Sequence, residues 1–297
     1  MRGSKAYAVA VRDPNGQIVT HTEPLNSNFY GGWFVRVPFL RGLTLLWDAL
    51  GLGTKSLMFS AQVAIPEEER DETGDIFSGP AQYGMVLLSL TLAIGLFFVL
   101  PAFLSKQIPT WLSWELSPLL INLIEGVIRL VLLVGYIWAI GLMPDVKRLY
   151  GYHGAEHKTI NAYEAGVELT PASVARFPLE HPRCGTAFLL TVVVLSILLF
   201  TLLPAAFTDN ILLRIVSRVV FIPVIAGIGY EFIRFTAKHQ DKTLIRLITK
   251  PNLLMQRLTT REPDEQMLEV AIRAFEQVLA SEFAPKPVTE LAEAHAG

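Results

Sequence analysis

Charged residues and cysteine are both scarce in this chain. Of its 297 residues only 18% are charged while 52% are hydrophobic, and the mean hydropathy is +0.42. Such a composition excludes an ordinary soluble globular protein and predicts a membrane protein with a lipid bilayer as its surroundings. The formal net charge of -2 provides no excess of positive charge, so we expect no nucleic-acid partner.

The single cysteine, Cys184, excludes a disulfide within the chain and is typical of a protein whose polar parts face a reducing compartment. The N-terminal stretch MRGSKAYAVAVRDPNG contains no apolar run of the kind found in signal peptides. We therefore expect no cleaved leader, and membrane insertion then depends on internal segments.

Long apolar runs are what the sequence does contain. A helix needs about 20 apolar residues to cross the roughly 30 Å hydrocarbon core of a bilayer. Four runs reach that length, and they cover residues 84–104, 118–143, 187–207 and 211–230. The sequence thus predicts a mainly α-helical, polytopic membrane protein with about four transmembrane helices.

Lysine and arginine are distributed unevenly around these runs. Of the 25 such residues, seven precede the first run, five lie between residues 144 and 186, and nine follow Glu231. The opposite side has only Lys106, Arg214 and Arg218, and the remaining residue, Arg129, lies within the second run. Because short cytoplasmic segments are enriched in positive charge, we expect a protein of the cell (inner or plasma) membrane with both termini and the central connection in the cytoplasm.

Polar segments divide the chain into three predicted parts. Residues 1–80 combine a β-hairpin, indicated by alternating KAYAVAVR and QIVTHTE around a DPNG turn, with an amphipathic helix over residues 38–63. Polar residues recur every seventh position of that helix, which favours a place at the membrane surface or against the bundle; the alternative is a further span. Residues 81–235 form the predicted membrane domain, and residues 236–297 a cytoplasmic helical region.

A second amphipathic helix is predicted over residues 263–280, in the stretch PDEQMLEVAIRAFEQVLA. Pro263 suits the first turn of a helix, and Asp264 and Glu265 favour its positive end. Apolar residues then recur at helical spacing. This apolar face requires a partner, which is either the helix bundle or another subunit of a homo-oligomer.

The segment YGYHGAEHKTINAYE carries the residues most suggestive of chemistry. On a helix, His153 and His157 lie on one face with Glu156 beside them. The H-x-x-E-H pattern is that of inverted zincins, in which two imidazoles bind zinc and the glutamate acts as general base. It predicts His153 and His157 as metal ligands and Glu156 as the catalytic residue. The alternative is a hydrated helix face, because Gly151 and Gly154 weaken the helix at that point.

Further candidate ligands lie at the same predicted depth, near the inner ends of the apolar runs. His181 and Cys184 precede the third run and Glu231 ends the fourth, so N, S and O ligands of a divalent metal such as zinc converge. Structural roles are the alternative, since Cys184 is small enough for a core and Glu231 can pair with a cation. Glu164 shares a helix face with His157 but stands about 10 Å along the axis, too far for one ion.

A separate polar group lies within the second apolar run, in NLIEGVIRL. Asn122, Glu125 and Arg129 share one helix face, and the two charged residues are four apart and able to pair. Charges within a membrane cost about 2.5 to 3.5 kcal/mol each on insertion scales. The group is therefore either an internal clasp, favoured by the local cancellation of charge, or part of a polar pathway.

Several blocks of the sequence resemble, in order, the YqhQ-like bacterial membrane proteins, a family of unknown function. These blocks are MRG, PFLRG, NLIEGVIRL, YGYHGAEHKTINAYE, HPRCGT, PVIAGIGYE and LTTREPDEQMLEVAI, and the match runs from about residue 1 to residue 280. The resemblance implies a bacterial inner-membrane protein, and members of this family have been labelled as metal-dependent enzymes. That label rests on the same histidine, glutamate and cysteine residues.

Three functions follow from these patterns. The first is a membrane protein with a metal site at the cytoplasmic face, acting as a metal-dependent hydrolase on a substrate that the sequence does not identify. The second is an oligomeric channel or transporter that uses the polar face of the second run. The third is a membrane scaffold without chemistry. Metal content after purification separates the first function from the other two.

Overall fold

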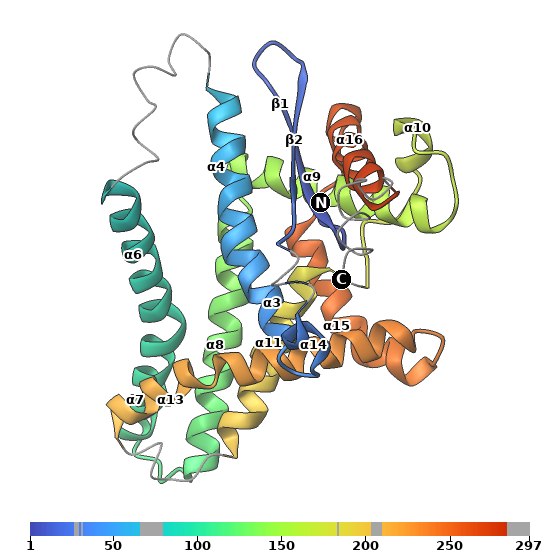
Figure 1. The fold of residues 1–297 in the computed structure, drawn as a ribbon. Helices are drawn as coiled ribbons and strands as arrows, with labels where there is room; N and C mark the ends of the chain where they lie inside the picture. Colours follow the sequence, from blue (N-terminus) through green and yellow to red (C-terminus); the bar gives the residue numbers. More distant parts are fainter. Residues whose placement is uncertain (27–29, 31, 66–79, 183, 203–209, 284–297) are drawn as a thin grey trace, which may run out of the picture.

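The chain is described here by a computed structural model covering residues 1–26, 30, 32–65, 80–182, 184–202 and 210–283. Outside one small sheet, its regular elements are helices (Figure 1). The N-terminal elements are β1 (Ala6–Arg12), β2 (Ile18–Pro24), α2 (Trp33–Arg36), α3 (Gly42–Trp47), a π-helical turn (Asp48–Leu52) and α4 (Gly53–Ala64). The following elements are α6 (Pro80–Ile94), a second π-helical turn (Gly95–Val99), α7 (Leu100–Leu112), α8 (Pro118–Ile140), α9 (Pro144–Glu164) and α10 (Pro171–Val174). The last elements are α11 (Gly185–Thr201), α13 (Ile211–Val220), α14 (Ile222–Lys238), α15 (Thr243–Thr259) and α16 (Glu265–Phe283).

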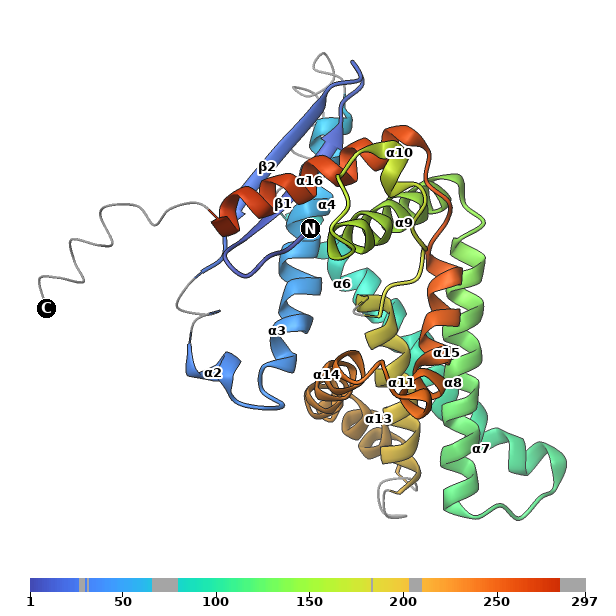
Figure 2. The same ribbon diagram turned by 90° about the vertical axis from the view of Figure 1, so that its right-hand side faces the viewer.

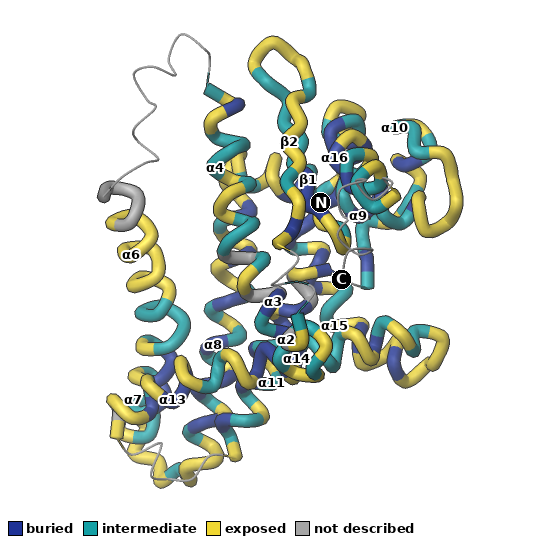
Figure 3. The backbone as a smooth tube through the Cα atoms, in the orientation of Figure 1, coloured by how far each residue is buried: buried dark blue, intermediate teal, exposed yellow. Residues whose placement is uncertain are grey.

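Among the described residues, three helical stretches are long and apolar enough to cross a membrane. They are Gly84–Leu112, Pro118–Ile140 and Leu212–Lys238, and Phe188–Thr201 is a shorter apolar helix. Large apolar side chains on α6 are exposed, including Leu87, Leu88 and Leu92, as expected of a surface that faces lipid (Figure 3). The prediction of a helical membrane protein with about four apolar helices is confirmed, while the number of passes and the orientation of the termini stay predictions.

The apolar helices do not all run in one direction. α8 and α11 stand upright in both views and pack against each other, whereas α13 and α14 run crosswise to them (Figures 1 and 2). A bilayer normal along α8 would therefore leave α13 and α14 lying across it. Length and composition identify a stretch such as Leu212–Lys238 as apolar, but they do not fix its tilt.

The predicted β-hairpin is confirmed. β1 and β2 pair antiparallel, with Ala6 opposite Pro24 and Arg12 opposite Ile18. The turn between them is closed by the Asp13 carboxylate, which accepts a hydrogen bond from the Gln17 amide at 2.7 Å. The hairpin packs against α16 and α4, so it forms part of the polar half of the molecule rather than a separate unit.

The apolar face of α16 finds its partner within the chain. Leu268, Ala271 and Ile272 pack with Ala155 and Ala162 of α9 in one buried cluster, and Val174 of α10 completes it. The hairpin covers the neighbouring part of α16. This packing fixes the position of α9, the helix that carries the HGAEH segment.

The helical stretch from α3 to α4 stands upright between α14 and the hairpin (Figure 2). Three of the four polar residues that recur at every seventh position of this stretch, Arg41, Asp48 and Lys55, have partners within the protein. Arg41 pairs with Glu231 of α14, and Lys55 pairs with Glu23 of β2 at 2.9 Å. Asp48 binds Arg2 at 3.1 Å. These contacts favour packing on the protein over a free position at the membrane surface.

Candidate metal centre

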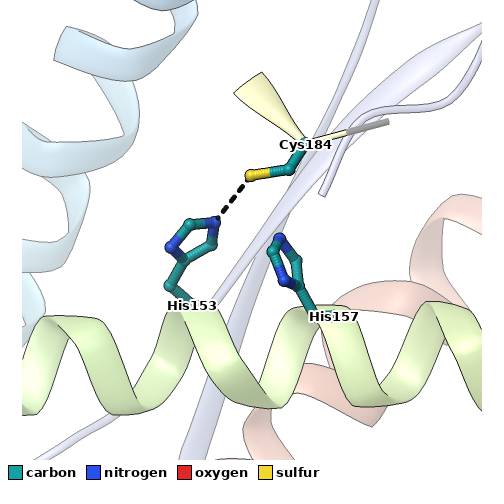
Figure 4. A group of neighbouring side chains, drawn as sticks. All are labelled: His153, His157 and Cys184. Carbon is teal, nitrogen blue, oxygen red and sulfur yellow. Dashed lines mark hydrogen bonds between the residues drawn. The ribbon is translucent and has the colours of Figure 1, made fainter. Parts of the chain in front are cut away.

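His153 and His157 lie one turn apart on α9, which continues unbroken through the HGAEH segment. Their ring centroids are 4.4 Å apart, and both rings lie on the side of the helix that faces Cys184 (Figure 4). The predicted helix face is therefore present. The weakening effect of Gly151 and Gly154 does not break the helix.

Gly154 has a packing role that explains its place in the helix. A Cβ atom at this position would lie 2.2 Å from the carbonyl oxygen of Arg261 and 2.9 Å from a methyl group of Leu179. The segment after α15 and the loop after α10 can therefore approach α9 only because the residue is glycine. The groups that orient the histidine rings come from the end of α15 and from the loop after α10.

Each histidine ring is anchored through its Nδ1 atom. His153 Nδ1 lies 2.8 Å from the Thr259 carbonyl oxygen, and His157 Nδ1 lies 2.5 Å from the Leu179 carbonyl oxygen. A carbonyl oxygen only accepts hydrogen bonds, so each Nδ1 must carry the hydrogen. In the neutral rings, each Nε2 atom then keeps a free lone pair. Metal-ligating histidines are typically held in this way.

Cys184 completes a group of three. It stands just before α11, is buried, and places its Sγ atom 3.3 Å from His153 Nε2 (Figure 4). One ligand atom from each of His153, His157 and Cys184 lies within 4.8 Å of the others. Zinc bonds of about 2.0 to 2.3 Å in a tetrahedron separate ligand atoms by roughly 3.5 Å. Small movements of the side chains would therefore bring all three into bonding distance of one ion.

The electrostatics of the group favour a thiolate. Burial alone raises the pKa of Cys184, but hydrogen bonds and charge from His153 and His157 outweigh burial and lower the pKa to about 5. For His153, burial lowers the pKa, while the hydrogen bond and charge of Cys184 raise it to about 9. Without a metal, the pair is thus a thiolate and an imidazolium at neutral pH.

His181 lies beside the group rather than within it. Its ring centroid is 5.9 Å from that of His157, and its Nε2 atom is 3.6 Å from a carboxylate oxygen of Glu164. Burial, followed by the charge of His157, lowers the pKa of His181. The amide of Gln256 binds the His181 backbone at two points, 2.9 Å from its nitrogen and 2.8 Å from its oxygen. His181 is thus a neighbour of the group of three and not a member of it.

Glu156 faces the same cavity. This cavity has a volume of about 390 Å³ and is lined by all of the predicted residues of the site except Glu231: His153, Glu156, His157, His181 and Cys184. Glu164, Arg2 and Tyr163 also line it. The sequence pattern therefore located the residues that surround one cavity.

Glu231 takes no part in the group of three described above. Its carboxylate accepts hydrogen bonds from Arg41, at 2.6 Å from Nε, and from the Phe39 amide at 3.2 Å. It thereby joins α14 to α3. Glu231 was expected to complete the metal shell. The structure instead shows its alternative role, an ion pair at the helix end.

Sequence patterns missed the groups that orient the two histidine rings. The carbonyl oxygens of Thr259 and Leu179 carry no side-chain signal, so a pattern of residue types could not find them. Gln256 is fully buried and was not predicted, although a polar residue among the apolar positions of NLLMQRL is a possible sign. Asn161 also binds the loop, through the carbonyl oxygens of Pro178 and Glu180.

The second polar group is larger than expected. Glu125 of α8 accepts hydrogen bonds from Arg129 at 2.7 Å, from Arg214 at 2.7 Å and from Arg218 at 3.1 Å. Asn122 accepts from Arg218 at 3.2 Å. All five side chains are buried, so three guanidinium groups share one carboxylate and the charges do not cancel.

Arg214 and Arg218 of α13 are among the few positively charged residues that the sequence pattern assigns to the side of the membrane opposite the cytoplasm. The structure places them between α13 and α8, fully buried against Glu125. Their spacing of four residues in LLRIVSRVV puts them on one helix face. That spacing is the signal that could have identified them as partners for the acidic residue.

The fold and the site define a helical membrane protein with a buried histidine and cysteine group at the end of its apolar helices. By sequence, the chain belongs to the family described as "Protein of unknown function (DUF1385)", whose model matches residues 37–281. It is 34% identical over 286 residues to "Uncharacterized protein YqhQ" of Bacillus subtilis (strain 168), covering 94% of this chain and 89% of that protein. No solved structure matches the chain.

Proposed function

We propose that this protein is a membrane metalloenzyme, a hydrolase whose divalent metal is held by His153, His157 and Cys184. One observation carries the proposal. Both histidines use Nδ1 to bind backbone carbonyl oxygens, which directs their Nε2 lone pairs toward the group that includes the Cys184 sulfur.

The donor set fits zinc better than the other common metals. Two imidazole nitrogens and one thiolate suit zinc, whereas magnesium and calcium prefer oxygen ligands. Three protein ligands with an open fourth position are typical of catalytic sites, and a fourth protein ligand is typical of structural ones. Binding through His181 would therefore convert this site into a structural one, whereas the separation of His181 from the group favours catalysis.

In the proposed hydrolysis, the bound metal and Glu156 have different roles. When bound, the metal supplies a Lewis acid that polarises the substrate and activates water. Glu156 lines the same cavity and is the residue expected to take up the proton of the attacking water and return it to the leaving group. His157 and Cys184 are both buried, whereas the cavity that they line leaves room for a substrate.

Metal analysis after purification in mild detergent tests this proposal. We expect about one zinc per chain in the wild-type protein and none in the His153→Ala, His157→Ala double variant. The matched control is His21→Ala with His239→Ala, which removes two histidines outside the site and should keep the metal. Wild-type protein that stays metal-free after reconstitution with zinc would contradict the proposal.

A second candidate function uses the same pair of residues without a metal. The Cys184 thiolate, 3.3 Å from His153 Nε2, is also the arrangement of a cysteine nucleophile and its general acid. Alkylation of the only cysteine distinguishes the two functions. Protection of Cys184 by added zinc supports the metalloenzyme, whereas rapid alkylation that zinc does not change supports the cysteine hydrolase.

The channel or transporter alternative receives less support from the described residues. Asn122, Glu125 and Arg129 are each at most 4% exposed, and the carboxylate is occupied by arginines. A conducting path needs polar groups that face water or the permeating ion. These contacts favour a clasp that joins helices.

A further inference from the structure

A second, larger cavity adjoins the candidate metal centre. Its volume is about 1020 Å³, compared with about 390 Å³ for the cavity at the histidines. The two cavities share Arg2, Glu164, Cys184 and Gly185 in their walls. A molecule in the larger cavity would therefore extend to the Cys184 side of the metal group.

One wall of this cavity is formed by the ends of apolar helices. Phe188 stands at the start of the apolar helix Phe188–Thr201. Tyr230 and Ile233 belong to the apolar stretch Leu212–Lys238. The cavity thus lies where the apolar part of the protein meets its polar part, which is the level of lipid headgroups in a membrane protein.

The rim of the cavity is positively charged. Arg234 and Lys238 lie one turn apart on α14 and both line the cavity. Like charges at this spacing repel each other. The charge of Arg234 acts on the Glu231 carboxylate, but in the described part of the chain neither Arg234 nor Lys238 lies within ion-pair distance of a carboxylate. Glu231, on the preceding turn, is occupied by Arg41, and Arg2 is paired with Asp48. Glu164 is the acidic residue of the cavity wall, so the rim carries more positive than negative charge.

We propose that this cavity binds an anionic amphiphile, a lipid with a phosphate-bearing headgroup, and that such a lipid is the substrate of the metal centre. The phosphate would bind Arg234 and Lys238, and the upper part of the acyl chains would lie along Phe188, Tyr230 and Ile233. The headgroup bonds would then reach the shared wall at Cys184. The assignment as substrate rests on the proposed function, whereas the binding of the lipid does not.

A lipid fits these walls better than a peptide does. Basic residues next to an apolar surface attract anionic headgroups, and each such residue contributes on its own. A peptide substrate would require a row of hydrogen-bonding backbone groups or an exposed strand edge. The described walls of this cavity come from α9, α11, α14, the loops next to α11 and α14, and the N-terminal residues 2–4. Neither β1 nor β2 lines it, and the β-bridge of Arg2 is already made to Tyr7.

Binding of short-chain lipids to the detergent-solubilised, chelator-treated protein tests the proposal. The probes are dioctanoyl phosphatidic acid, dioctanoyl phosphatidylcholine, dioctanoylglycerol and glycerol 3-phosphate, measured by native mass spectrometry and calorimetry. We expect phosphatidic acid to bind most tightly, because it alone combines a net negative phosphate with acyl chains. Glycerol 3-phosphate binding as tightly would assign the cavity to a soluble phosphate compound and overturn the lipid proposal.

Matched variants locate the binding. Arg234→Gln with Lys238→Gln should weaken phosphatidic acid binding about tenfold or more, because two charge-assisted contacts are lost. The control is Arg246→Gln with Lys250→Gln, an exposed arginine and lysine at the same spacing on α15. Equal weakening by both pairs would show general attraction to a basic surface and overturn the proposal, as would displacement of the lipid by an acidic peptide.

Zinc content measured on the same samples separates this inference from the proposed function. Lipid binding by a protein that never takes up zinc would refute the metalloenzyme and leave the lipid site standing. A protein that binds zinc but not phosphatidic acid would refute the lipid site and leave the metalloenzyme standing. The Arg234→Gln, Lys238→Gln variant should keep its zinc, because neither residue belongs to the group of three ligands.

Discussion

At the scale of single residues, Cys184 and His153 each shift the pKa of the other. The neighbouring histidines lower the pKa of the thiol to about 5, and the thiolate raises the pKa of His153 to about 9. Either shift depends on the other residue, since burial alone would move both values in the opposite direction. Removing one partner should therefore change the titration of the other.

Because Cys184 is the only cysteine, the ultraviolet absorbance of its thiolate can be followed in the intact, metal-free protein. A lowered pKa means that the thiolate is present above about pH 5 and is lost as the pH falls through that value. His153→Ala should move the midpoint upward, because the hydrogen bond and the charge of His153 are both lost, while His21→Ala leaves it unchanged. A wild-type midpoint near the ordinary value of about 8.5 would contradict the ion pair.

Gln256 is a positioning residue whose effect should be measurable through the metal. Its amide holds the backbone of His181, in the loop that carries both Cys184 and the carbonyl group of Leu179. Loss of groups that support metal ligands typically weakens binding about 10- to 100-fold. We expect Gln256→Ala to lower zinc affinity by at least tenfold in competition with a chromophoric chelator.

Asn252→Ala is the control for this measurement, because Asn252 lies one turn earlier on α15 and its amide binds Thr191 of α11 instead. It should leave zinc affinity within about threefold of the wild-type value, the scatter expected where no supporting contact of a ligand is removed. Equal losses in both variants would indicate that any disturbance of α15 reaches the site, and that Gln256 has no special role.

At the scale of helices and strands, local sequence predicted which helices and strands form, but it did not predict how they pack against one another. The apolar runs predicted the helices around residues 84–112 and 118–140, and the DPNG turn predicted the hairpin, because these signals depend on neighbouring residues. The crosswise direction of α13 depends on ion pairs with Glu125 of α8, and that of α14 on its packing against α11 and α3. The anchors of His153 and His157 are backbone carbonyls from distant segments. No pattern of residue types records such contacts.

Gly154 offers a test of how closely the elements of the site must approach. Gly154→Ala would place a methyl group 2.2 Å from the Arg261 carbonyl oxygen, so either α9 or the segment after α15 must move. Such overpacking costs about 1 to 3 kcal/mol. We expect a lower midpoint of thermal unfolding in detergent and a loss of zinc, since the Thr259 carbonyl lies two residues from Arg261.

Gly135→Ala on α8 is the matched control, because nothing lies within 4 Å of the added methyl group. Alanine favours a helix over glycine by up to about 1 kcal/mol, so this variant should keep its zinc and unfold at the same or a slightly higher temperature. A Gly154→Ala protein that behaves like the control would show that the close contact is not needed.

At the scale of the whole molecule, α8 connects two polar groups of different kinds. Near its first turns, Glu125 binds arginines from α8 and α13, and Arg129 also donates to the Phe97 carbonyl oxygen at 2.9 Å. Beyond its last turn, α9 presents the histidines. The first group joins helices through charge, and the second offers ligand atoms toward a cavity. This contrast supports a structural role for the arginines and a chemical one for the histidines.

Glu125 should therefore matter for folding more than any other acidic residue that the structure describes. Glu125→Gln would leave three buried guanidinium groups without a carboxylate, and breaking a buried ion pair from one side costs about 3 to 5 kcal/mol. We expect little folded protein by size-exclusion chromatography in detergent. Glu115→Gln, an exposed residue before α8, should behave as wild type.

Arg218→Gln keeps this prediction testable if Glu125→Gln yields no protein. It removes one of the three positive charges and leaves Glu125 paired with Arg129 and Arg214, so the loss of thermal stability should be clearly smaller. A larger loss for Arg218→Gln than for Glu125→Gln would mean that Arg218, rather than the shared carboxylate, holds α13 against α8. Because the arginine group lies toward the start of α8 and the histidines lie beyond its end, folded Arg218→Gln protein should still bind zinc.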